Sequence, residues 1–158
     1  MHNNKLKGEN DVVYNREGKE KDMIEVYIDG SSRGSGSRDI SGAGIFIKND
    51  GTIYEYIVPL PEMTNHEAEF HAVIEALNIC RKKFPNEIIS CHSDSRLVVD
   101  AIDKTYVKNE RYKQLLATIM EKAAIFPYFF IKWIPSNQNK HADQLAKRAI
   151  YEQLNEKA

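Results

Sequence analysis

The chain has few cysteines, no long apolar run and no excess of charge of either sign. Only Cys80 and Cys91 occur in 158 residues, and both lie in apolar stretches, where reduced thiols behave as small hydrophobic side chains. We therefore expect no disulfide framework and a reducing, cytoplasmic environment. No apolar segment approaches the roughly 20 residues that span a bilayer. No charged-then-apolar leader is visible either, so we expect neither membrane insertion nor secretion.

The charges of the chain cancel almost completely. Its 22 lysine and arginine residues face 23 acidic residues, which leaves a formal net charge of -1. A global basic field for nucleic acid is therefore excluded, and any phosphate contact must come from local patches. The 42% hydrophobic content is sufficient for one domain with a substantial core.

Two regions of different composition divide the chain. Residues 1–22 are polar, with five basic and five acidic side chains. They lack apolar periodicity beyond Val12, Val13 and Tyr14, so we expect a flexible N-terminal extension, with docking as a short strand as the alternative. The remaining residues, 23–158, are expected to form the domain.

The apolar pattern predicts strands and helices in an α/β order. Residues 23–29 alternate with period two and predict a buried central strand that ends at Asp29, followed by a turn at 30–32 and a glycine-rich loop. Further strands are predicted over 43–48, 52–59, 87–93 and 128–134. Helices are predicted over 65–84, 95–102, 110–126 and 141–153. The first three strands are antiparallel, and the last two each follow helices, which implies parallel neighbours with right-handed crossovers.

An acid at the end of a buried strand requires compensation, because burying an unpaired carboxylate costs several kcal/mol. The predicted helix from residue 65 offers two acids that could join Asp29. Glu67 shares its helix face with His71 and Glu75 and is expected to be a surface charge. Glu69 points inward, because its face continues as an apolar stripe made of Ala72, Val73, Ala76, Leu77 and Cys80.

Two further acids can be interpreted either as helix-stabilising residues or as ligands of the site. Asp94 closes the strand predicted over 87–93, where ligands bind in parallel sheets, but it could equally cap the next helix. Asp143 opens the last helix, where it could simply complement the helix dipole. Asp29, Glu69, Asp94 and Asp143 can all meet at one edge of the sheet, where their repulsion would require cations. Mg²⁺ or Mn²⁺ suits such oxygen ligands, and two ions bridged by one carboxylate form a site for phosphodiester chemistry.

Four segments of the chain resemble the type 1 ribonucleases H. They are Ile28-Asp29-Gly30-Ser31-Ser32, Thr64-Asn65-His66-Glu67-Ala68-Glu69, His92-Ser93-Asp94-Ser95 and Asn139-Lys140-His141-Ala142-Asp143-Gln144-Leu145-Ala146. The resemblance implies an α/β, ribonuclease H-like five-stranded mixed sheet, three antiparallel strands and then two parallel ones, with helices on both faces. It also implies an endonuclease that hydrolyses the RNA strand of RNA/DNA hybrids with two Mg²⁺ ions, or Mn²⁺, and leaves 5′-phosphate and 3′-hydroxyl ends.

The resemblance also implies roles for individual residues. The family's metal-binding acids fall on Asp29, Glu69, Asp94 and Asp143, with Asp29 bridging both ions. The implied substrate contacts are the backbone near Gly30 and Ser31, the side chain of Asn65, and Thr64 and His66 near phosphate.

The chain departs from the family pattern at several places. The loop 135–140 lacks the mobile histidine of many members, and His141 is expected to be a surface residue pointing elsewhere. Ser35-Gly36 replaces a common Asn-Pro pair, and Trp133 is expected to belong to the core rather than to stack on bases. No extra basic helix fits between Ile102 and Tyr112. We expect either a smaller phosphate-binding patch or simply solvent-exposed charges at four basic residues of this region, Lys104, Lys108, Arg111 and Lys113.

Three functions remain open on the sequence. The first is a hybrid-cutting nuclease, and the second is a catalytically weak or silent module of the same fold that binds nucleic acid or protein. The third is another nuclease on this fold, such as a junction resolvase or an exonuclease. All four acids are present, which favours an enzyme, and Thr64-Asn65 beside Glu69 favours the hybrid-cutting branch. No feature of the sequence requires an obligate protein partner.

Overall fold

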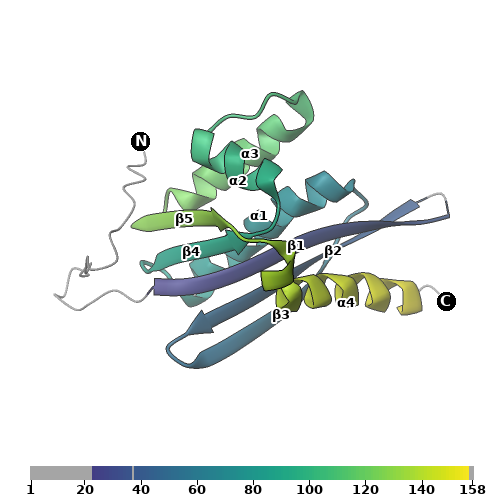
Figure 1. Cartoon of the computed structure of the whole chain (residues 1–158), viewed down its shortest axis with the longest axis horizontal. Helices are drawn as coiled ribbons and strands as arrows, with labels where there is room; N and C mark the ends of the chain where they lie inside the picture. The colour runs from purple at the N-terminus through teal and green to yellow at the C-terminus, as the bar shows by residue number, and fades with distance from the viewer. Residues whose placement is uncertain (1–22, 37, 157–158) are drawn as a thin grey trace.

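A five-stranded mixed sheet forms the centre of the molecule (Figure 1). The computed structural model describes residues 23–36 and 38–156, so the predicted N-terminal extension lies outside the described residues. The strands are β1 (Met23–Ser35), β2 (Arg38–Asn49), β3 (Thr52–Leu60), β4 (Ile88–Ser93) and β5 (Tyr128–Trp133). They lie in the order β3-β2-β1-β4-β5, with β1 antiparallel to β2, β2 antiparallel to β3, and the pairs β1–β4 and β4–β5 parallel. The predicted fold class is confirmed.

Helices cover both faces of this sheet. They are α1 (Asn65–Lys83), α2 (Arg96–Lys104), α3 (Glu110–Ala123) and α4 (Lys140–Glu156), with a short 3₁₀ turn, η1 (Ser136–Gln138), before α4. Figure 1 shows α1, α2 and α3 on one side and α4 on the other. The larger core lies on the α1 side, where the inward residues of β1, Ile24, Val26 and Ile28, are almost completely buried.

The first hairpin is longer than the sequence pattern predicts. β1 continues past Asp29 as far as Ser35, and β2 begins at Arg38, so the predicted turn at residues 30–32 and the predicted loop before residue 43 are wrong. Asp29 therefore lies in the middle of a strand, opposite Gly44 of β2. The hairpin instead turns near Gly36, which has a φ of 66°.

Glycine misled the prediction because two of these glycines serve packing rather than turning. A Cβ at Gly44 would lie 2.2 Å from the carbonyl oxygen of Ala142, and a Cβ at Gly42 would lie 2.6 Å from the Cβ of Ala149. Real Cβ atoms do not approach that closely. The two glycines therefore let the backbone of α4 lie directly against β2.

The other elements agree with the predictions to within three residues at each end. Asp50 and Gly51 have φ values of 49° and 80° and form the two-residue hairpin turn expected from Asn-Asp-Gly. Cys80 and Cys91 are free and buried, and burial raises the pKa of the Cys80 thiol to about 12. No helix in the described ranges combines the length and the apolarity that a membrane crossing requires.

Candidate active site

The pairing of β1 places Asp29 between the two halves of the site. Opposite Asp29 on β2 lies Gly44, which is covered by the first turn of α4 and therefore brings Asp143 near. On the other side, Ile28 pairs with Ser93 of the parallel strand β4. Asp94 follows immediately, so the end of β4 delivers a carboxylate beside β1.

Gly30 brings the first helix to the same place. A Cβ at this position would lie 2.0 Å from the carbonyl oxygen of Ala68 and 2.7 Å from the amide nitrogen of Glu69. The first turns of α1 thus press against β1 one residue beyond Asp29. The glycine is needed for this close approach, and it fixes where Glu69 stands.

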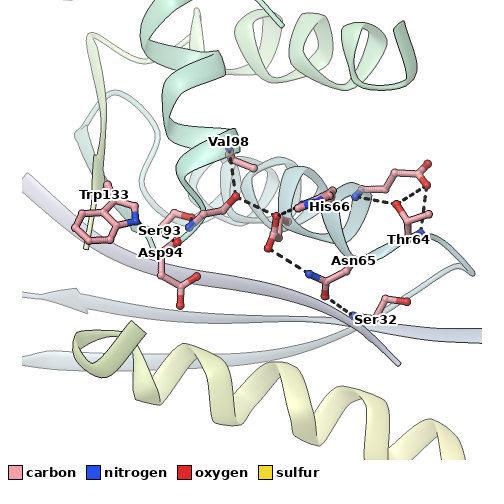
Figure 2. Close-up of polar contacts among 11 residues, drawn as sticks. Ser32, Thr64, Asn65, His66, Ser93, Asp94, Val98 and Trp133 are labelled. Atoms are coloured by element: carbon pink, nitrogen blue, oxygen red, sulfur yellow. Dashed lines mark hydrogen bonds and ion pairs between the residues drawn. The ribbon is translucent and has the colours of Figure 1, made fainter. Parts of the chain in front are cut away.

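The carboxylate of Glu69 is held by three side chains (Figure 2). Ser95 Oγ donates a hydrogen bond of 3.0 Å to Oε2, and His66 Nδ1 lies 3.0 Å from the same oxygen. Asn65 Nδ2 donates to Oε1 over 3.4 Å, and the Asn65 Oδ1 accepts from the backbone amide of Ser32 at 3.2 Å. Contacts from α1, β1 and the start of α2 therefore restrict Glu69 to one orientation.

The backbone of Asp94 is anchored to β5. Trp133 Nε1 donates a 3.1 Å hydrogen bond to the Asp94 carbonyl oxygen, and the Arg96 guanidinium lies 3.7 Å above the indole ring. Burial raises the pKa of the Asp94 carboxyl, although a hydrogen bond from the Asn139 side chain acts in the opposite direction. Asn139 also donates a 2.8 Å hydrogen bond to the Ile28 carbonyl oxygen, which ties the segment before α4 to β1.

The four acids act on one another through space. Burial, the charges of Asp94, Asp143 and Glu69, and a hydrogen bond with Asp143 together raise the pKa of Asp29 to about 8. Such a shift requires that the other carboxyls lie near Asp29 in a poorly solvated place. The structure therefore brings the four acids near one another beside the middle of β1, where β4 ends and the first turns of α1 and α4 approach.

Comparison with known proteins identifies the family to which the chain belongs. The family described as Reverse transcriptase-like matches residues 28–149. The chain is 31% identical over 152 residues to the ribonuclease H of Hyphomonas neptunium, covering 84% of this chain and 95% of that protein. The chain belongs to the ribonuclease H family.

Two further family relatives show how far the similarity extends. A candidate hydrolase of Enterococcus faecalis, EbsB, is 40% identical over 132 residues, covering 81% of this chain and 94% of that protein. The structure of LC11-RNase H1 in complex with an RNA/DNA hybrid superposes with a TM-score of 0.72 at 28% identity, covering 83% of this chain and 99% of that one.

Glu67 lies in the segment of α1 that resembles the family, but its side chain caps the N-terminus of the helix. Its Oε1 accepts hydrogen bonds from Thr64 Oγ1 at 2.8 Å and from the Thr64 amide at 3.2 Å, and its own amide donates to Thr64 Oγ1. These bonds lower the pKa of Glu67 and form a capping box. The spacing Thr-x-x-Glu is the sequence signature of this motif. Glu67, which we expected to be only a surface charge, is therefore a capping residue of α1.

Two other residues behave partly as expected. His141 stacks on Phe46, with ring centroids 3.9 Å apart, and its Nε2 lies 3.0 Å from Oε2 of Glu55 on β3. It therefore points to β3, as a half-exposed surface residue. Trp133 is only half-buried, because one end packs on the core while Arg96 covers its ring.

Sequence reasoning missed Ser95 and Asn139 as parts of this site. Ser95 is buried, caps α2 by accepting from the Val98 amide, and orients Glu69 at the same time. Its position directly after Asp94 was the available signal. Asn139 is 1% exposed, and only the tertiary fold reveals its bond to Ile28, since 111 positions separate the two residues.

The donor chemistry of the four acids fits the hard divalent cations that the family implies. In this structure they are not arranged as a metal-binding group. Among the described residues, no three histidine, cysteine, aspartate or glutamate side chains stand so that they could hold a metal ion. The carboxylates are instead engaged with protein groups. Glu69 contacts Ser95, and Asp143 contacts Asp29 and Lys147.

Proposed function

We propose that the protein is a metal-dependent endonuclease that hydrolyses the RNA strand of RNA/DNA hybrids. One observation carries the proposal: Asp29 is partly buried and lies within reach of the charges of Asp94, Asp143 and Glu69, and burial together with these charges raises its pKa to about 8. A fold that only needed stability would not gather buried, mutually repelling acids. The hybrid bound by the similar LC11-RNase H1 supports the choice of substrate.

Asp29, Glu69, Asp94 and Asp143 would hold the ions. When bound, two Mg²⁺ ions supply an activated water and neutralise the developing charge on the cleaved phosphate, which leaves a 5′-phosphate and a 3′-hydroxyl. The chain itself provides orientation. Ser95 fixes the carboxylate of Glu69, and Trp133 fixes the backbone of Asp94.

Recognition of the RNA strand is assigned to the edge around the start of α1. RNA is distinguished from DNA by contacts to 2′-hydroxyl groups, and we propose that the backbone of Gly30 and Ser31 and the amide of Asn65 provide them. The exposure of Asn65 and its bonds to β1 and to Glu69 support this choice. Thr64 and His66 are proposed to lie near phosphate.

The test is cleavage of a labelled RNA strand in a hybrid, with RNA/RNA and DNA/DNA duplexes as controls. We expect cleavage of the hybrid alone in Mg²⁺ or Mn²⁺, and a loss of more than a hundredfold in Asp94→Asn. Even changes of residues that only hydrogen-bond the metal ligands lower metal affinity or activity about 10- to 100-fold. Full activity in that variant would contradict the assignment of the acids, and an intact hybrid in both metals would favour a silent binding module.

We also propose that the protein acts in a reducing compartment such as the cytoplasm. The free, buried thiols of Cys80 and Cys91 support this. We propose further that it needs no obligate protein partner, because all four acids come from one chain. Cell fractionation and light scattering of the purified protein test the two statements.

A further inference from the structure

Lys147 is paired with one of the four acids. Its Nζ lies 2.9 Å from Asp143 Oδ2, one turn further along α4. The charge of Asp29 also acts on this ammonium group. In the described part of the chain, no other lysine or arginine forms an ion pair with Asp29, Glu69, Asp94 or Asp143.

The other contacts of Asp143 make this pair significant. The same carboxyl shares a hydrogen bond with Asp29, so it stands between the buried acid and the lysine. A divalent cation that binds Asp29 and Asp143 needs carboxylate oxygens that these partners now engage.

We propose that Lys147 is a tethered cation of the site, whose ammonium neutralises Asp143 while no metal is bound and must be displaced before a divalent cation can bind that carboxylate. The Lys147 side chain is 64% exposed, so it can swing into solvent without disturbing the core. A divalent cation bound to Asp143 and the ammonium of Lys147 beside the same carboxylate would repel each other. The lysine therefore stabilises the metal-free protein and lowers its affinity for the metal. This inference rests on the proposed function, because it concerns the metal of that same site.

Calorimetric titration with Mg²⁺ and Mn²⁺, without nucleic acid, measures the effect directly. We expect Lys147→Met to bind the ions about 1.5- to fivefold more tightly, the range expected when a metal no longer has to break an exposed ion pair. Lys147→Arg keeps the charge and should bind like the wild type. The matched control is Arg148→Met, since Arg148 is equally exposed on α4 but pairs with Glu152 at 3.9 Å, and it should leave the affinity unchanged.

Thermal unfolding supplies a second measurement that does not depend on activity. Metal-free Lys147→Met should melt below the metal-free wild type, and the difference should vanish at saturating Mg²⁺. Arg148→Met should show no such metal-dependent difference. A uniform loss of stability at every Mg²⁺ concentration would mean that Lys147 is only a structural residue.

The outcomes separate the two proposals. If the wild type binds Mg²⁺ and cuts the hybrid but Lys147→Met binds the metal with equal or lower affinity, the role of Lys147 is overturned and the proposed function stands. If the wild type neither binds the ions nor cuts the hybrid, both are overturned.

Discussion

The two helices that bring acids to Asp29 lie on the sheet in different ways. α1 packs through large apolar side chains such as Phe70 and Leu77, which are fully buried, and needs a glycine only at Gly30. α4 packs through alanines against Gly42 and Gly44, nearly backbone to backbone. Both helices bury large apolar side chains, Leu145 and Ile150 in the case of α4, but α4 also requires two glycines of β2 beneath its alanines.

This difference extends to the carboxylates. Glu69 on α1 receives hydrogen bonds from residues of its own first turn and from Ser95. The carboxylate of Asp143 on α4 is instead paired with Lys147 at 2.9 Å and hydrogen-bonded with Asp29. The position of Asp143 thus depends on how closely α4 approaches the sheet, and the position of Glu69 depends on local bonds.

The largest effect should come from closing the gap under α4. Gly44→Val places side-chain atoms where the backbone of Ala142 and Ala146 now lies, and we expect a loss of about 3 kcal/mol or more in the free energy of unfolding. The control is Gly34→Val, because the nearest atom to a Cβ there is 4.0 Å away. Urea denaturation compares them, and equal stabilities would refute the close-packing account of α4.

The next effect is a pH dependence that tests the raised pKa of Asp29, which burial and the neighbouring carboxyls produce. Because the pKa of Asp29 is raised to about 8 in the folded protein, from about 3.9 in an unfolded chain, the native state binds the extra proton between these values. The stability of the metal-free protein should therefore fall as pH rises from about 4 to 8, by at most about 1.4 kcal/mol per pH unit for this group. Asp29→Asn should flatten that slope in urea titrations at several pH values, and an unchanged slope would contradict the raised pKa of Asp29.

A smaller effect should separate the two tasks of Ser95 on the α1 side. Ser95→Gly removes the hydrogen bond to Glu69 but costs the cap of α2 only a few tenths of a kcal/mol. We expect about a tenfold loss of metal affinity or hybrid cleavage with little change in stability. Asn109→Gly, which alters the cap of α3 away from the acids, is the matched control and should retain both. A variant of Ser95 with normal metal affinity would show that Glu69 needs no such support.

The smallest effect should come from Glu67. Glu67→Ala opens the capping box and should cost about 0.5 to 1 kcal/mol of stability, with hybrid cleavage unchanged at 25 °C. Glu69→Gln, two residues further along, should behave in the opposite way and abolish cleavage. If Glu67→Ala were inactive although folded, the division of labour between these neighbouring acids would be wrong.

The sequence predicts the site better than it predicts the hairpin that supports it. The inward position of Glu69 follows from helical periodicity, and Asp94 follows from its place at the end of a parallel strand. The continuation of β1 beyond Asp29 could not be predicted in this way, because Gly42 and Gly44 look like turn residues until the approach of α4 is known. Lys147 was equally invisible, since its spacing from Asp143 has meaning only once Asp29 is found beside it.

Asn139 joins the segment before α4 to β1 across 111 positions. During synthesis on a ribosome, Asp29, Glu69 and Asp94 all emerge well before Asn139 and Asp143. The acid cluster is therefore completed only when the final helix has been made and has docked. A nascent chain that has emerged only as far as Asp94 carries three of the four acids, and the site that we propose can form only after α4 has followed and packed on the sheet.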